Sequence, residues 1–278
     1  MVRLDSATAT DSGRERSDNQ DQVWAQVSQP SEGEPVGLFI VCDGVGGHHG
    51  GQFASQWAIE AIKSEFEDYF YPDDPQKTVL LPQEDLTSGE KEEETTRVSE
   101  SRKLERIVIE AAQKANRVVY EYAQNKPQEA KDAGTTLTMA FLVGNRAVIA
   151  NVGDSRTYLL RDKQIRQITK DHSLVATLVA SGQLKPEDVF SHPQRNLIFR
   201  SLGQKDEIQV DTYIELLKKG DRLLLCSDGL WEMIQDEEAI ARLIHKSKTP
   251  NDACKSLIDA ANNAGGQDNI SAVLVVVR

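Results

Sequence analysis

Four aspartates of this sequence stand where apolar stretches end or begin. Asp43, Asp154 and Asp228 each follow an apolar run, and Asp268 stands just before one. If these runs are strands of an antiparallel sheet, the start of one strand lies beside the ends of its neighbours, so the four carboxylates could meet at one rim. Four anions that close together require a cation, because unpaired buried charges are very costly. The alternative is that each aspartate only caps a turn.

The ligand types around these aspartates indicate which cation would fit. An oxygen-only set selects hard divalent ions, magnesium or manganese, which keep several waters. Two such ions about 3.5–4 Å apart can activate a water and hold a phosphoryl group. Arg16, just upstream of Asp21, could grip phosphate oxygens with its planar guanidinium group. A charged loop of this kind is also often merely solvated.

A glycine-rich loop follows the first aspartate. The apolar run Leu38–Val41 is typical of a buried strand. Five of the eight residues after Asp43 are glycines, and from Phe53 to Phe66 the apolar residues recur at helical spacing. The order is therefore strand, carboxylate, glycine-rich turn and helix. Glycines leave the carboxylate and the nearby peptide carbonyls open to an ion or ligand.

The composition limits the class of protein. The chain has 278 residues, 39% of them hydrophobic, which is enough for a sizeable core. A formal net charge of −12 argues against a nucleic-acid partner. No apolar run approaches the roughly 20 residues of a membrane span, and the N-terminus lacks the apolar segment of a signal peptide. The three cysteines show no C-x-x-C spacing, which favours a reducing compartment. We expect a soluble, cytoplasmic protein with no membrane contact.

Periodicity predicts the remaining elements. Two short strands are expected within residues 1–30. After residue 134, four predicted strands form one meander: Thr135–Val143, Ala147–Val152, Thr157–Leu160 and Ile165–Ile168. Two further runs, Gln209–Leu216 and Asp221–Ser227, predict a hairpin through Lys219 and Gly220. Helices are expected at about residues 52–70, from residue 104 to 122, at 174–180, and near 237–245 and 251–263. Ile270–Val277 is the last predicted strand.

Two segments do not follow these patterns. Residues 72–103 have scarcely any apolar periodicity, and we expect a flexible surface insertion there. The polar, proline-punctuated stretch within residues 184–204 is expected to form a surface flap. We interpret neither segment as a domain boundary, so residues 1–278 are expected to form a single domain.

Seven short motifs resemble those of one family, the metal-dependent protein serine/threonine phosphatases (PPM, type 2C), in their bacterial form. They occur in the family's order and span essentially the whole chain: Arg16–Asp21 (RSDNQD), Cys42–His48 (CDGVGGH), Gly134–Thr136 (GTT), Gly153–Arg156 (GDSR), Asp171–Ser173 (DHS), Cys226–Leu230 (CSDGL) and Gln267–Asn269 (QDN). The resemblance implies an α+β fold, a four-layer αββα sandwich of two antiparallel β-sheets flanked by helices.

The resemblance also implies a role for each matching residue. Asp43 would bridge two metal ions, and the Gly44 carbonyl would bind one of them. Asp228 and Asp268 would complete the protein ligands of the first ion. Asp21 would act on the second ion through water. The implied cofactors are two Mn²⁺ or Mg²⁺ ions, with a weaker third.

Two more residues take implied roles beside the metals. Asp154 matches the aspartate that shares the third ion with Asp228, and Arg16 would hold the substrate phosphate. The flap would lie beside the active site. The implied reaction is hydrolysis of phosphoserine and phosphothreonine on proteins by direct attack of metal-bound hydroxide, which is a signal-transduction activity. The partners are then phosphorylated proteins, and we expect a monomer.

The general acid stays open at this point. In the eukaryotic branch of the family a histidine directly follows the glycine of the Asp-Gly turn, but here Val45 occupies that place. His48 or His49, farther along the loop, could protonate the leaving oxygen, and so could a water on a metal ion. Either histidine could also be purely structural.

Two other classes of function compete with this interpretation. One is a catalytically silent phosphoprotein-binding module on the same fold, which should lack some of the carboxylates. The other is a hydrolase of small phosphate esters or nucleotides, since a metal centre of this kind is indifferent to the leaving group.

Overall fold

The computed structural model describes residues 2–30, 33–46, 50–71, 92–126, 130 and 133–278, with only the backbone described for residues 92–100. Its first sheet has the strand order β1-β12-β11-β8-β9. The strands are β1 (Leu4–Asp11), β12 (Ile270–Val277), β11 (Arg222–Cys226), β8 (Arg156–Arg161) and β9 (Gln164–Gln167). All neighbouring pairs of strands in this sheet are antiparallel.

The second sheet has the order β10-β7-β6-β3-β2, again with antiparallel pairs throughout. Its strands are β10 (Asp211–Leu216), β7 (Arg146–Val152), β6 (Leu137–Val143), β3 (Val36–Cys42) and β2 (Gln22–Ser28). A small two-stranded sheet pairs β4 (Gly44–Val45) with β5 (Gly134–Thr135). Strand β4 directly follows the predicted ligand Asp43.

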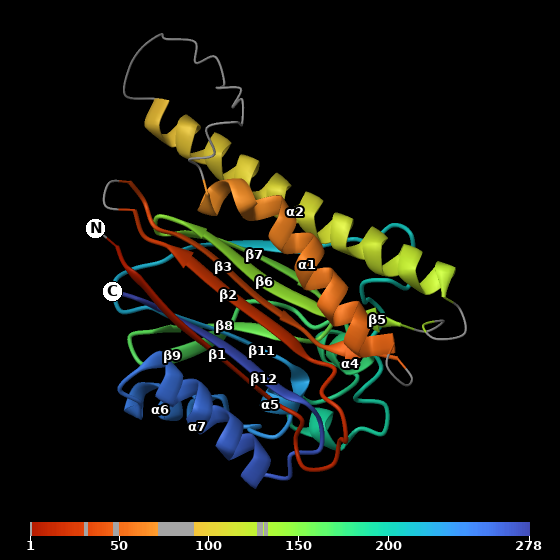
Figure 1. Cartoon of the computed structure of the whole chain (residues 1–278). Coiled ribbons are helices and arrows are strands. Elements are labelled where there is room, and N and C mark those ends of the chain that lie inside the picture. The colour runs from red at the N-terminus through yellow and green to blue at the C-terminus, as the bar shows by residue number, and fades with distance from the viewer. Residues whose placement is uncertain (1, 31–32, 47–49, 72–91, 127–129, 131–132) are drawn as a thin grey trace.

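The two large sheets face each other, and helices cover both outer faces (Figure 1). Helices α1 (Gly50–Phe70) and α2 (Glu92–Asn125) cover the second sheet, and α6 (Glu237–Lys246) and α7 (Pro250–Asn263) cover the first. A central cluster of apolar side chains, which includes Phe39, Ile149 and Val273, fills the space between the sheets. The expected four-layer αββα sandwich is thus confirmed.

The antiparallel pairing brings the predicted site residues to one end of the sandwich. Gln22 pairs with Cys42, so Asp21 and Asp43 lie side by side at the same end of strands β2 and β3 in the second sheet. Cys226 pairs with Ala272, which places Asp228 and Asp268 together at the same end of strands β11 and β12 in the first sheet. Each pair follows from the end of one strand meeting the start of the next.

Two predicted strand pairings were wrong. β7 and β8 belong to different sheets, and so do β10 and β11, so neither the four-strand meander nor the hairpin through Lys219 and Gly220 exists. The chain crosses from one sheet to the other in both places. Apolar alternation and turn residues predict a strand and its end, but they carry no information about which sheet the next strand joins.

The boundary of the predicted insertion also needs correction. Helix α2 begins at Glu92, so residues 92–103 are helical, whereas the insertion was expected to extend to residue 103. These residues are rich in glutamate, lysine and arginine, which favour helices even where no apolar face is present. The rest of the predicted insertion, residues 72–91, lies outside the described residues.

Three short helices complete the described chain. α4 (Leu174–Ala180) precedes the predicted flap, the 3₁₀ helix η1 (Pro186–Ser191) lies within it, and α5 (Asp228–Trp231) starts at a predicted metal ligand. Within the described part of the chain, no helix combines the length and the apolar character needed to cross a membrane.

Candidate metal and phosphate site

A cavity of about 650 Å³ opens at the edge where both sheets end. Its lining includes six of the residues predicted from the sequence: Arg16, Asp43, Gly44, Asp154, Asp228 and Asp268. Asp154 lies in the crossover between β7 and β8, so the cavity collects carboxylates from both sheets and from the link between them. Four of the aspartates predicted from the sequence therefore line a single cavity.

Asp21, also predicted from the sequence, does not line this cavity. Its side chain is buried, and its Oδ2 accepts a hydrogen bond of 2.7 Å from the Ser227 hydroxyl group. Its Oδ1 is also buried and has no hydrogen-bond partner among the described residues. Burial raises the pKa of the Asp21 carboxyl to about 6. An anion with an unpartnered buried oxygen is the arrangement that a nearby cation would stabilise.

The backbone on both sides of Asp43 is held firmly. The Asp43 N–H donates to Thr136 Oγ1 at 3.0 Å, and the Asp43 carbonyl accepts from the Thr136 N–H at 2.8 Å and from Thr135 Oγ1 at 2.9 Å. Burial, followed by the charges of Asp21 and Asp228, raises the pKa of the Asp43 carboxyl well above its usual value. The scaffold thus fixes a carboxylate whose charge it does not compensate.

Gly44 must be glycine in this fold. Its N–H donates to the Gln20 carbonyl at 3.2 Å, and a Cβ at this position would run into the carbonyl of Gly51 in the first turn of α1. A Cβ on Gly51 would in turn meet the Gly44 carbonyl at 2.8 Å. The glycines therefore let the loop and the helix start approach each other directly, and the Gly44 carbonyl stays at the cavity.

Asp228 and Asp154 repeat the pattern of uncompensated charge. Asp228 Oδ1 is buried without a hydrogen-bond partner in the described part of the chain, and burial together with the charge of Asp154 raises the pKa of Asp228 well above its usual value. Burial, followed by the charge of Asp171, raises the pKa of Asp154 to about 7. The Asp154 carbonyl accepts a hydrogen bond of 3.1 Å from the Trp231 indole.

Asp268 differs from the others because it has a cationic partner. Arg16 Nη2 lies 2.7 Å from Asp268 Oδ2 in an ion pair, and Asp268 Oδ1 accepts from the N–H of Asn269. The Arg16 side chain is 55% exposed, so it can turn toward a ligand in the cavity without leaving a buried pocket. The predicted phosphate-binding arginine is thus within contact of a predicted metal ligand.

Asn269 is a structural member of the site to which the sequence analysis gave no role. Its Nδ2 donates to the carbonyls of Ser12 and Asp18, and its Oδ1 accepts from the Gln20 N–H. One amide side chain therefore fastens the loop that carries Arg16 to the rim. Its position directly after Asp268 is the signal that could have identified it.

His48, the predicted general acid, lies outside the described residues, as does His49. The flap borders the cavity through Asn196, Leu197, Ile198 and Gln204. The flap backbone is joined to α4, since the Leu174 N–H donates to the Leu197 carbonyl at 2.8 Å.

The donor set fits hard divalent ions. The carboxylates of Asp43, Asp154, Asp228 and Asp268 are hard oxygen donors in the cavity lining. One buried oxygen of Asp228, and one of Asp21 outside the lining, has no partner in the described chain. As they stand, no three acidic, histidine or cysteine side chains of the described residues are placed so that together they could hold a metal ion. Such a site suits magnesium or manganese, which keep several waters as ligands.

Comparisons with known proteins identify the family. The profile of the protein phosphatase 2C family matches residues 12–260. The chain is 33% identical to the serine/threonine phosphatase stp of Listeria monocytogenes over 266 residues, which cover 96% of this chain and 93% of that protein. It is 35% identical to protein phosphatase PhpP of Streptococcus pneumoniae over 272 residues, 98% of this chain and 97% of the relative.

Solved structures show the same likeness. The Mycobacterium tuberculosis serine/threonine phosphatase PstP/Ppp superimposes with a TM-score of 0.78 at 32% identity, covering 99% of both chains. The catalytic domain of the serine/threonine protein phosphatase PstP, in complex with two manganese ions, gives a TM-score of 0.77 at 31% identity and covers 100% of this chain and 99% of that one. The chain therefore belongs to the protein phosphatase 2C family, as its motifs predict, in the company of bacterial serine/threonine phosphatases.

Proposed function

We propose that this protein removes phosphate from phosphoserine and phosphothreonine of other proteins, with manganese or magnesium as its cofactor. The observation that carries the proposal is the arrangement of carboxylates around the cavity where both sheets end, which we call the rim cavity. Aspartates from both sheets and from the crossover between them line one cavity, and a buried oxygen of Asp228 lacks a partner among the described residues, as does one of Asp21 outside the lining. The manganese complex of PstP, a relative of nearly equal length, supports the choice of ion.

The chain's own residues divide into ion ligands and supports. Asp43 and the Gly44 carbonyl would serve two core ions, Asp228 and Asp268 would complete one of them, and Asp21 would act on the other through water. Bound there, the ions would lower the pKa of a water and neutralise phosphoryl oxygens, which is the chemistry of direct hydrolysis without a phosphoenzyme. The hydrogen bonds that Thr135 and Thr136 make to the Asp43 peptide hold that ligand in place.

Arg16 would bind the phosphate of the substrate. Its guanidinium group lies at the cavity and is paired with Asp268 in the free protein. A phosphate can compete for this arginine because a planar guanidinium donates two parallel hydrogen bonds to phosphate oxygens. The Asp268 carboxylate that Arg16 leaves behind would then be free for an ion.

Asp154 would share a weaker third ion with Asp228. The two charges interact, since each lies near enough to the rim cavity to line it and the charge of Asp154 raises the pKa of Asp228. Protonation of the leaving oxygen would come from His48 or from a water in this part of the cavity. The flap, residues 184–204, would contact the polypeptide on either side of the phosphorylated residue.

We also infer a cytoplasmic, monomeric enzyme that acts in signal transduction. The three cysteines are free and buried in the structure, which suits a reducing compartment.

Turnover of three substrates tests the proposal. A phosphothreonine peptide, a nucleotide and p-nitrophenyl phosphate should be compared with manganese present and after chelation. We expect manganese-dependent release of phosphate from the peptide and from the aryl ester, with little from the nucleotide. Preference for the nucleotide would identify a hydrolase of small phosphate esters. Binding of the peptide without turnover would identify a silent module.

A further inference from the structure

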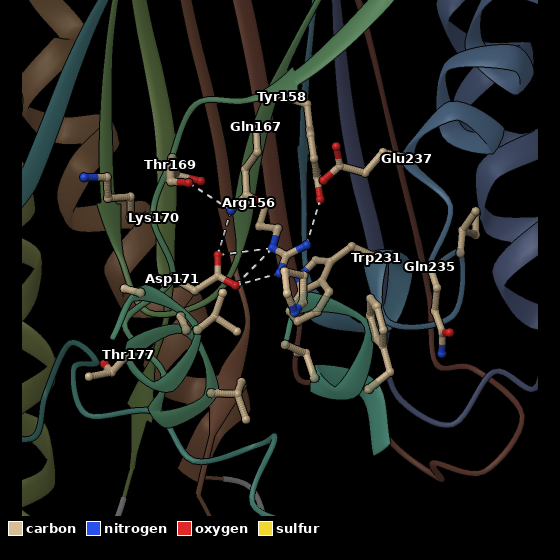
Figure 2. Close-up of a pocket in the computed structure, with 18 residues that line it drawn as sticks. Arg156, Tyr158, Gln167, Thr169, Lys170, Asp171, Thr177, Trp231, Gln235 and Glu237 are labelled. Carbon is tan, nitrogen blue, oxygen red and sulfur yellow. Dashed lines mark hydrogen bonds and ion pairs between the residues drawn. The ribbon is translucent and has the colours of Figure 1, made fainter. Parts of the chain in front are cut away.

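The rim cavity is lined by Asp43, Asp154, Asp228 and Asp268. A second cavity, of about 780 Å³, lies beside it and has no part in the proposed chemistry. Strands β8 and β9, helix α4, the 3₁₀ helix η1 and the segment from α5 to α6 form its walls. We call it the flap pocket (Figure 2). Most of its wall is apolar, and the side chains that provide this surface include Val175, Val179, Val189, Phe190 and Ile234.

One wall of the flap pocket is polar but fully satisfied. Arg156 Nη2 lies 2.7 Å from Asp171 Oδ2 in an ion pair whose two side chains are largely buried, and Arg156 Nη1 donates to the Tyr158 hydroxyl at 3.0 Å. The Arg156 guanidinium also lies 3.5 Å from the centroid of the Trp231 ring. Figure 2 shows these side chains gathered around Arg156. This cluster has no charge left over for a ligand.

Glu237, by contrast, forms no direct ion pair with a described residue, although the positive charge of Arg156 acts on it and partly offsets the effect of its burial. It lies in the first turn of α6 and lines the flap pocket, with its carboxylate turned toward Tyr158 in Figure 2. It is half-buried, and no residue of the described chain forms a hydrogen bond or ion pair with it. Burial raises the pKa of Glu237. A cation arriving at this side of the pocket would be favoured, because it would compensate a partly desolvated negative charge.

The flap pocket and the rim cavity share a wall. Trp231 lines the flap pocket, and its indole N–H donates to the carbonyl of Asp154, which lines the rim cavity. The flap also borders both: Val189 and Phe190 face the pocket, whereas Leu197 faces the rim. A polypeptide whose phosphorylated residue reaches the rim would therefore pass close to the pocket.

We propose that the flap pocket docks a segment of the phosphoprotein substrate that carries a bulky apolar side chain next to a lysine or arginine. The apolar side chain would occupy the space between α4, η1 and Ile234, and the basic one would pair with Glu237. The net charge of −12 makes a basic segment the complementary partner. This inference rests on the proposed function, because it assumes that the ligand is a protein substrate.

The test uses phosphothreonine peptides that differ only in the position of one Leu-Arg pair. The pair is placed at successive positions about three to eight residues from the phosphothreonine, a reach of roughly 10–28 Å in an extended chain. We expect one position to raise kcat/KM by about tenfold, which is the order expected for burying a leucine side chain. A Leu-Gln pair at that position should give a gain about two- to fivefold smaller, because it cannot form the ion pair.

Two variants and one matched control locate the effect. Ala176→Phe, which fills the pocket from α4, should abolish the gain. Glu237→Gln should reduce it about two- to fivefold, the order of an ion pair at a partly exposed site. Glu238→Gln removes the same charge from the next residue, whose exposed side chain does not line the pocket, and should leave the gain unchanged. All three should hydrolyse p-nitrophenyl phosphate as the wild type does.

Three outcomes would overturn the docking proposal: no position of the pair raises kcat/KM, the gain survives in both pocket variants, or Glu238→Gln removes as much as Glu237→Gln. Loss of turnover on every substrate would instead contradict the proposed function. In that case, the fluorescence anisotropy of a labelled, unphosphorylated Leu-Arg peptide still measures whether the peptide binds to the pocket. Binding that disappears in Ala176→Phe supports docking, and binding unchanged in that variant refutes it.

Discussion

The guanidinium group of Arg16 lies 2.7 Å from the carboxylate of Asp268, so two residues with different proposed ligands are bound to each other. The contact joins the loop before β2 to the start of β12, more than 250 residues away along the chain. Ion binding and phosphate binding would both break it. The pair therefore neutralises one of the carboxylates at the cavity and links the proposed binding of the two ligands.

Arg16→Ala should lower kcat/KM for a phosphothreonine peptide by about ten- to hundredfold, the value of one charge-assisted hydrogen bond of about 1.5–3 kcal/mol. Manganese affinity, measured by calorimetry, should stay equal or rise, because Asp268 loses its competing partner. Arg14→Ala is the matched control on the same exposed loop. Kinetics equal to the wild type would show that Arg16 is only a loop charge.

Asp43→Asn and Asp228→Asn should each abolish the tight binding of manganese and nearly all turnover. The metal-free variants should fold, and we expect them to be at least as stable as the wild type, since each removes charge from a cluster in which the carboxylates repel one another. Calorimetric titration and urea unfolding after chelation measure the two properties. Asp259→Asn, an exposed aspartate on α7, is the control. Near-normal metal binding would exclude these aspartates from the site.

The stability of the metal-free protein should depend on pH through Asp154. Its carboxyl has a pKa of about 7 in the folded chain, against about 3.9 in an unfolded one. Between these values the folded state holds a proton that the unfolded state has lost, so the free energy of unfolding contributed by this group falls as the pH rises.

Asp154→Asn should therefore stabilise the chelated protein relative to the wild type at pH 8, with a difference that shrinks toward pH 4. Urea unfolding across this range in the presence of chelator measures it. A difference that is constant with pH would mean that Asp154 titrates normally.

The loss of activity in Asp154→Ala should also depend on the leaving group of the substrate. A weakly held third ion that assists protonation of the leaving oxygen matters more for a threonine alkoxide than for nitrophenolate, which scarcely needs a proton. We expect a larger loss of kcat on the phosphopeptide than on p-nitrophenyl phosphate, with the two tight manganese sites still filled. Equal activity of Asp154→Asn on both substrates would assign Asp154 to the shape of the Gly153–Arg156 turn alone.

The segment between α1 and α2 should be dispensable for chemistry only as far as Glu92. Replacing residues 73–90 with a short glycine–serine linker should preserve turnover of p-nitrophenyl phosphate, because changing the length of a surface connection costs little. Extending the replacement through residue 103 should lower the unfolding temperature, since it removes the first turns of α2. A shorter variant that fails to fold would show that residues 73–90 pack on the core.

The carboxylates that line the rim cavity could be predicted because each one follows or precedes an apolar run. Asp43 and Asp228 end strands and Asp268 precedes one, and the antiparallel rule then places them together. The sheet that each strand joins could not be predicted, since β7 and β8 have ordinary strand patterns on both sides of Asp154. That assignment depends on which faces of the two sheets bury each other.

Other features depend on contacts far apart in sequence. The pairing of Arg16 with Asp268 and the three hydrogen bonds of Asn269 join segments separated by some 250 residues, and no local pattern signals them. The start of α2 at Glu92 was missed for a different reason. Its first turns have helical propensity without an apolar face, and the periodicity rule detects only the face.

The proposed ion ligands belong to two sheets that no disulfide joins, because all three cysteines are free. Asp21 and Asp43 belong to one sheet, and Asp228 and Asp268 to the other. An ion held between them would connect the two sheets and would bind to the folded chain but not to the unfolded one. Its free energy of binding would then add to the free energy of unfolding, so the supply of metal would set the heat tolerance of the protein as well as its turnover.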